Sequence, residues 1–233
     1  MRFLPAVLLL LTSLATAAEP FTFSETFDAP FDASRFTTPI PNKNTTVRDG
    51  VMVTQGESGG KYPPMVYLPV AGADLGISFR YRHTGEGGWL WFFVDGDDGF
   101  GSVDHLLRVK LLRHAVELQV DGHTKDPAHP LRQKTGREAD PVSGAWRTNE
   151  ILPATKLDLS GTGWHEVKLV FSGETVKVSI DDTAWTETLS RPGFREQKRK
   201  LLWMQNAGKD TIDIDGIRVQ ERPLERSAGF EPQ

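Results

Sequence analysis

The sequence predicts an all-β fold whose antiparallel strands form a sandwich or a barrel. Short runs that alternate apolar and polar residues recur along the chain, and this is the period of strands buried on one face. Turn signals rich in Gly, Asp and Ser separate the runs, and no helical pattern of convincing length occurs. About eleven to thirteen short strands result, a number that suits a sandwich or a barrel.

One run organises this prediction, residues 87–99 (GGWLWFFVDGDDG). It is short and rich in aromatic and β-branched residues, so we expect a strand. Alternation gives it two apolar faces, one with Trp89, Trp91, Phe93 and Asp95 and the other with Leu90, Phe92 and Val94. Two readings stay open: a central strand covered on both sides, or a strand that offers its indoles to sugar rings.

The other runs show burial on one side only, which is typical of antiparallel sheets. Apolar side chains alternate with polar ones in residues 75–82, 107–111, 116–120, 167–171 and 176–180. Further strands are expected at residues 21–27, 200–205 and 211–220.

Local signals add detail to this pattern. Asp49-Gly50 predicts a type I′ hairpin turn, and Asp215-Gly216 predicts a bulge. Residues 123–156 are expected to form a Pro-, Gly- and Lys/Arg-rich loop around Trp146, and loops of this length are usually functional lids or else disordered. The basic run 198–200 is expected to be a solvated turn, and His165 a core histidine because it lies on an aliphatic face.

The N-terminal residues 1–17 are expected to be a cleavable signal peptide. Arg2 precedes an apolar core, and Ala15-Thr16-Ala17 supplies the small-residue cleavage pattern. The apolar stretch is too short to span a bilayer. We therefore expect a secreted or periplasmic protein with one β-sandwich domain over residues 18–222 and a flexible tail at 223–233.

Composition excludes several functional classes. The chain has no cysteine, so it has neither disulfides nor thiol catalysis nor thiolate metal sites. It has 27 basic and 31 acidic residues, which leaves no basic surplus for binding nucleic acid. It also lacks a Gly-rich phosphate loop and a nucleophile elbow.

Five segments occur in an order that is informative as a set: FSETFDAPFDASRF, VRDGVMV, ISFRYR, GWHEVKLVFSGETVKVSIDDTAW and IDIDGIRV. Together they resemble the concanavalin A-like jelly rolls, which are two-sheet antiparallel β-sandwiches. Within these, the chain is most similar to secreted domains of the 3-keto-disaccharide hydrolase type. The resemblance implies a protein that processes glycans, with an oligosaccharide or polysaccharide as its partner and no cofactor.

Two shorter sequence motifs contain candidate functional residues. Some secreted relatives carry His-x-x-Arg-Val and then an Asp/His-rich segment, which here correspond to His105 to Val109 and to Asp121-Gly-His123. The hydrolase-type domains often place Glu-x-Gln on a central strand, as in Glu117-Leu-Gln119. The chain departs from them after its FR strand, where HTGEGG replaces their usual Asn-Ser-Gly segment.

Polar side chains of neighbouring strands are candidates for binding substrate. If these strands pair beside the Trp89 run, one surface would carry Trp89, Trp91, Arg80, Arg82, Arg108, Lys110, Glu117 and Gln119. Charged and amide groups beside indoles suit sugar hydroxyls and ring faces. The alternative is a solvated face with cross-strand ion pairs.

The candidate catalytic residues are His105, Arg108, Glu117, Asp121 and His123. Glu117 and Asp121 lie about 13 Å apart along an extended strand, too far for a two-carboxylate mechanism. The E-x-D-x-E signature of jelly-roll glucanases is absent. A 3-keto sugar needs only one base and one oxyanion stabiliser, for instance His123 or Glu117 with Arg108.

The acidic turn after the Trp89 run allows two interpretations. Asp95, Asp97 and Asp98, with Asp104 nearby, can wrap a calcium ion, or they form a hydrophilic hairpin turn. For the whole protein, three hypotheses remain: a glycan-processing hydrolase or lyase, a non-catalytic carbohydrate-binding module, and a structural or adhesive exoprotein.

Overall fold

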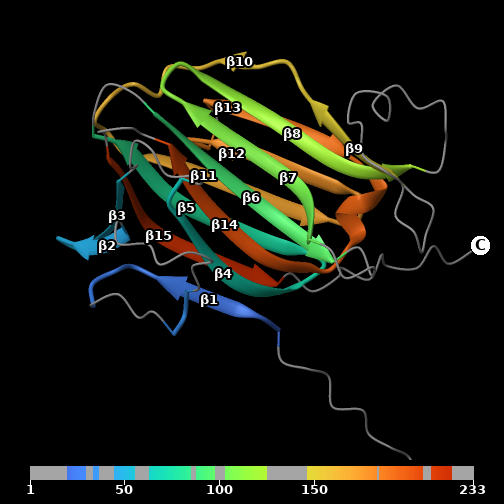
Figure 1. The fold of residues 1–233 in the computed structure, drawn as a ribbon, viewed down its shortest axis with the longest axis horizontal. Helices are drawn as coiled ribbons and strands as arrows, with labels where there is room; N and C mark the ends of the chain where they lie inside the picture. Colours follow the sequence, from blue (N-terminus) through green and yellow to red (C-terminus); the bar gives the residue numbers. More distant parts are fainter. Residues whose placement is uncertain are drawn as a thin grey trace, which may run out of the picture.

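The chain folds into two antiparallel sheets packed face to face (Figure 1). This computed structural model describes residues 20–29, 34–36, 45–55, 63–84, 88–97, 103–124, 146–182, 184–206 and 211–221. The expected leader 1–17 and tail 223–233 lie outside these ranges. Within them, no helix is long and apolar enough to cross a membrane. The prediction of an all-β, two-sheet antiparallel sandwich is therefore confirmed.

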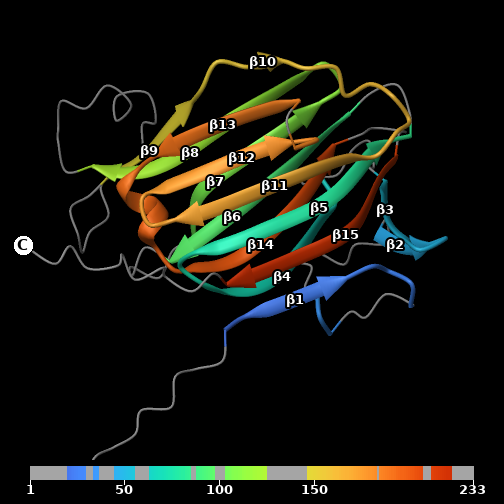
Figure 2. The ribbon, with the colours of Figure 1, turned by 180° about the vertical axis from the view of Figure 1, so that it is seen from behind.

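Sheet A has eight strands, in the order β13-β12-β11-β5-β15-β3-β2, with β1 also paired to β15 (Figure 2). The strands are β1 (Thr22–Glu25), β2 (Thr45–Arg48), β3 (Val51–Gln55), β5 (Leu75–His83), β11 (His165–Ser172), β12 (Thr175–Ile180), β13 (Trp185–Ser190) and β15 (Thr211–Glu221). Strands distant in sequence are thus neighbours in this sheet.

Sheet B has seven strands, in the order β10-β8-β7-β6-β14-β4, with β9 also paired to β8. The strands are β4 (Met65–Gly72), β6 (Trp89–Asp97), β7 (Val103–Leu112), β8 (Ala115–Thr124), β9 (Trp146–Ile151), β10 (Thr155–Lys156) and β14 (Lys198–Asn206). A short 3₁₀ helix, η1 (Pro192–Arg195), precedes β14.

The core lies between the sheets and is built from the inward half of each alternating strand. From β6, Leu90, Phe92 and Val94 are fully buried. The ring of Phe92 lies 4.8 Å from that of Phe79 on the facing sheet, and Trp203 contacts both rings. Apolar burial of this kind supplies the main driving force of folding in a chain without disulfides.

The local turn predictions are confirmed. Asp49 and Gly50 both have positive φ, 53° and 72°, as a type I′ turn requires. The register of β15 against β5 shifts after Asp215, where Gly216 has a φ of 60°. His165, expected to be a core histidine, is the first residue of β11; its side chain is 14% exposed and its Nδ1 lies 2.8 Å from Asp181, so it lies at the margin of the core.

Two other predictions were wrong. The expected loop 123–156 contains strands β9 and β10, and β8 continues through Thr124; residues 125–145 lie outside the described ranges. The basic run 198–200 is not a solvated turn but the start of β14, and the Lys198 side chain is fully buried. The prediction of exposure rested on the positive charge of this run alone. In the structure, the Lys198 ammonium is buried because it donates to the carbonyl oxygens of Ala73 and Phe194.

Candidate functional site

The outer face of sheet B carries most of the candidate residues, because β6, β7 and β8 are direct neighbours. Their outward side chains are Trp89, Trp91, Phe93 and Asp95 on β6, His105, Arg108 and Lys110 on β7, and Glu117, Gln119 and Asp121 on β8. Trp91, Lys110 and Glu117 form one transverse row, and Phe93, Arg108 and Gln119 form the next. The sequence-predicted surface therefore exists across these three strands.

A bulge in β7 brings His105 and Arg108 to the same face. Residues three apart on a regular strand point to opposite faces. Here the register between β6 and β7 shifts after Val94, so that Asp95 faces His105 and Leu106 is the extra residue. Leu106 turns inward and packs over Gly96, where an added Cβ would lie only 2.7 Å from its Cδ1.

A buried carboxylate orients His105. Asp95 is 1% exposed, and its Oδ1 lies 2.6 Å from His105 Nδ1, whereas the His105 side chain is 32% exposed. Because a carboxylate accepts the Nδ1–H, the neutral ring directs the lone pair of Nε2 outward. Lys200 Nζ, 3.3 Å from Asp95 Oδ2, balances the negative charge. A histidine held in this way can act as a general base.

Arg108 is fixed by a chain of hydrogen bonds along β8. Its Nη2 donates to Asp121 Oδ2 at 2.5 Å, and its Nη1 donates to Gln119 Oε1 at 3.3 Å. Gln119 Nε2 in turn donates to Glu117 Oε1 at 2.9 Å. The guanidinium lies 5.6 Å from the Phe93 ring, which also contacts His105. The structure thus places a rigid cation near the oriented histidine.

The indoles form an aromatic wall beside these polar groups. The rings of Trp89 and Trp91 are 4.8 Å apart, and Trp91 meets Phe93 edge-on at 5.5 Å. Lys110 Nζ lies 5.3 Å from the Trp91 ring and 4.0 Å from Glu117. Both indoles are half-buried on the outer face, whereas Phe93 and Asp95 on the same face are 4% and 1% exposed. The outer side of β6 is therefore open at Trp89 and Trp91 and covered at Phe93 and Asp95, so each of the two readings holds for part of the strand.

Two predicted binding residues lie elsewhere. Arg80 and Arg82 belong to β5 in sheet A, which pairs with β11 and β15 and not with β6. Arg82 Nε donates to Asp213 at 2.8 Å, and Arg80 pairs with Asp215. Their placement beside the Trp89 strand was therefore wrong: the chain crosses to the other sheet between β5 and β6.

The remaining candidates are only partly described. His123 lies on β8 opposite Arg147, but its side chain is outside the described set. The same holds for the Asp97 side chain and for all of Asp98, whereas Asp95 faces His105 and Lys200. In the described part of the chain, no group of three or more His, Asp or Glu is placed to hold a metal. Calcium at this turn stays a prediction.

Sequence reasoning missed three contributions to the site. Asp95 was placed on the Trp89 face but given a role only in the acidic turn, Lys200 was assigned to a solvated run, and Tyr67 was given no role. All three meet because β14 lies between β6 and β4, with Lys200 Nζ 4.4 Å from the Tyr67 ring. Burial, and then the charge of Asp95, raise the pKa of Tyr67. No local signal in the sequence indicates this pairing.

Solved structures with this fold include glucanases. SCLam, a non-specific endo-β-1,3(4)-glucanase from family GH16, is 13% identical with a TM-score of 0.54, covering 90% of this chain and 94% of its own. LamA from Zobellia galactanivorans, in complex with laminaritriose and laminaritetraose, is 14% identical with a TM-score of 0.59, covering 85% and 98%. A Bacillus licheniformis β-glucanase is 10% identical with a TM-score of 0.58, covering 87% and 98%.

No family model and no curated protein matches the chain. At identities of 10–14%, the similarity to the glucanases concerns the fold. The chain therefore has the fold of the concanavalin A-like jelly rolls, with a sandwich architecture similar to that of the GH16 glucanases.

Proposed function

We propose that this protein is an exported enzyme that cleaves the glycosidic bond of a 3-keto glycoside on the outer face of sheet B. The observation that carries the proposal is the buried Asp95 that holds His105, beside Arg108 and the aromatic wall. The jelly-roll fold, which in other proteins serves glucan hydrolysis, supports a carbohydrate substrate.

His105 is the proposed general base. The ketone at C3 of the sugar acidifies the proton on C2, and His105 Nε2 takes that proton. The electrons of the C2–H bond form an enolate, whose negative oxygen is stabilised by Arg108. Asp95 stabilises the imidazolium that results.

Collapse of the enolate completes the cleavage. Its electrons form a C1–C2 double bond, the C1–O bond breaks, and the leaving oxygen takes the proton from His105. Water then adds across the double bond to give the free 3-keto sugar, so one water is consumed in each turnover. Trp89 and Trp91 would stack on the sugar rings, and Lys110, Glu117 and Gln119 would bind hydroxyl groups.

The experiment compares two histidines that each pair with an aspartate through Nδ1. His105→Gln should lower kcat on a 3-keto aryl glycoside by about 10²–10⁴-fold, the usual contribution of a general base. His165→Gln is the matched control, because His165 also pairs through Nδ1 with an aspartate but lies on sheet A. It should keep activity within about twofold of the wild type.

The same assay separates the alternatives. Turnover of unoxidised laminarin that depends on Glu117 would replace our proposal with a two-carboxylate hydrolase whose second carboxylate comes from another strand. If the protein turns over no substrate but oligosaccharides quench its Trp fluorescence, it is better described as a carbohydrate-binding module. The paired indoles support this second candidate.

A further inference from the structure

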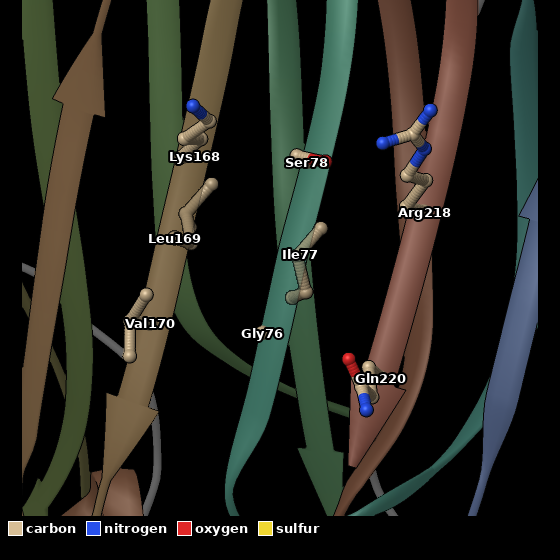
Figure 3. A pocket seen from close by; sticks show the side chains of 8 residues that line it. All are labelled: Gly76, Ile77, Ser78, Lys168, Leu169, Val170, Arg218 and Gln220. Atoms are coloured by element: carbon tan, nitrogen blue, oxygen red, sulfur yellow. The ribbon is translucent and has the colours of Figure 1, made fainter. Parts of the chain in front are cut away.

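The outer face of sheet A contains a groove along β5. Its floor is formed where β5 carries the small residues Gly76 and Ser78, between β11 and β15 (Figure 3). Lys168 and Arg218 face each other across Ser78, and the register of both neighbouring strands places all three in one row. Val170 and Gln220 flank Gly76 in the next row. The open volume is about 310 Å³.

A second pocket continues this face in the direction of His83. It is lined by Arg80, Arg82, Trp164, Asp215 and the Asp49-Gly50 turn, among others, and has a volume of about 490 Å³. Arg80 follows Ser78 by two residues on the same face of β5, so the two pockets lie end to end. The Arg82 and Arg80 guanidinium carbons lie 4.6 and 5.3 Å from the half-buried Trp164 ring.

Three of the four basic side chains named on this face are balanced by carboxylates. Arg80 pairs with Asp215 and Arg82 with Asp213, whose side chains are 10% and 6% exposed. Lys168 Nζ lies 2.9 Å from Glu166 and 2.6 Å from Asp182. The second pocket therefore alternates guanidinium donors with carboxylate acceptors, whereas the groove itself is lined by Lys168, whose charge is balanced, and by the exposed Arg218, which adds one positive charge. A polyanion gains little from such a surface, whereas hydroxyl groups can donate to the carboxylates and accept from the guanidinium groups.

We infer that this groove is a second binding site, for a neutral linear polysaccharide, on the sheet opposite the candidate catalytic face. The furrow over Gly76 and Ser78 accepts an extended chain, and Trp164 with its two arginines receives a sugar unit at one end. The site is independent of the proposed catalysis, because its residues come from another sheet. This second site would hold the protein on a polysaccharide while the outer face of sheet B cleaves a glycosidic bond at a chain end.

The decisive variant fills the furrow without harming the fold. Ser78→Glu places a carboxylate between Lys168 and Arg218, and opposite charges on neighbouring strands stabilise a sheet. Thr188→Glu is the matched control. It adds the same charge to an exposed position of the same sheet, opposite Lys177 and two strands beyond β11, which forms the edge of the groove.

Binding is measured by affinity electrophoresis in native gels that contain laminarin, xylan or, as the anionic probe, alginate. We expect laminarin or xylan to retard the wild type and the Thr188→Glu variant equally. Ser78→Glu should weaken this retardation at least fivefold, and Trp164→Ala, checked for folding by its Tm, should weaken it as well. Cleavage of a small 3-keto glycoside should be unchanged in Ser78→Glu.

Three results would overturn the inference. These are equal retardation of Ser78→Glu and Thr188→Glu, no retardation by laminarin or xylan, and retardation by alginate alone. Because the gels report binding and not turnover, these results are distinct from a failure of the proposed catalysis. A wild type that is retarded but cleaves nothing would keep the second site and remove the enzyme.

Discussion

Asp95 is the residue whose removal best tests how His105 works. Asp95→Asn keeps the size of the side chain but removes the charge that stabilises the imidazolium, and its amide group can turn a donor toward Nδ1. We expect kcat on a 3-keto glycoside to fall by about 100-fold or more while KM changes little, because Asp95 does not reach the substrate.

Steady-state kinetics on the purified variant measure this split. A rise in KM with kcat unchanged would assign Asp95 to binding and would contradict its role as a positioning residue.

The buried Lys198 leads to a second prediction for a single residue, which concerns how stability depends on pH. Its ammonium donates to the carbonyl oxygens of Ala73 and Phe194 and lies 4.4 Å from the Phe171 ring. Burial lowers the pKa of Lys198 from 10.5 to about 8, although Asp74 and Glu196 oppose this shift. Between these two values the unfolded chain binds more protons than the folded protein, so Lys198 makes stability rise with pH.

The comparison is with Lys198→Met, which keeps an unbranched side chain of similar length. Between pH 7.5 and 9.5, the free energy of unfolding of the wild type should gain about 2 kcal/mol relative to this variant. Urea unfolding of both proteins at several pH values measures the difference. A constant difference across this range would show that Lys198 has an ordinary pKa in the folded protein.

At the scale of elements, the bulge between β6 and β7 couples the core to the site. Gly96→Ala would place a Cβ 2.7 Å from the buried Leu106, which is the bulge residue next to His105. We expect a loss of stability of about 1–3 kcal/mol from overpacking and a larger relative loss of activity. Unfolding curves and kcat/KM, measured on the same preparation, test this expectation.

Gly163→Ala is the control, because an added Cβ there meets no atom within 4 Å and the backbone has no positive φ. Equal stability and activity of the Gly96 and Gly163 variants would mean that the bulge does not position His105.

The predictions from sequence succeeded where the signal is local. Period-two alternation placed Glu117, Gln119 and Asp121 on one face, and Asp49-Gly50 identified its hairpin turn. They failed where partners come from distant segments. Arg80 alternates as regularly as Arg108, and nothing local indicates that β5 belongs to the other sheet.

Predicting the site requires both local sequence signals and the pairing of distant strands. The odd spacing of His105 and Arg108 conflicts with plain alternation, and only the bulge at Leu106 reconciles them. The family resemblance linked the two residues without giving this reason. Lys200 joins Asp95 through a pairing of β14 with β6 that spans about half the chain, so it could not be read from the sequence.

At the scale of the whole molecule, the expected signal peptide leads to the prediction that the protein is exported and cleaved. Expression of the full chain in a bacterial host should yield a periplasmic or secreted protein that begins at Ala18, because Ala15-Thr16-Ala17 fits the cleavage pattern. N-terminal sequencing and the intact mass identify the start. A protein that keeps Met1 and stays in the cytoplasm would contradict the assignment of residues 1–17.

The position of β15 has a consequence for the order of biosynthesis. This last described strand lies between β5 and β3 and also pairs with β1, with Thr22 opposite Gln220. Sheet A is therefore split into two halves until the ribosome has made Thr211–Glu221. Folding that waits for such long-range contacts is slow. Sheet A of the nascent protein would remain incomplete until β15 has been made, which leaves time for a translocation machinery to capture the unfolded chain.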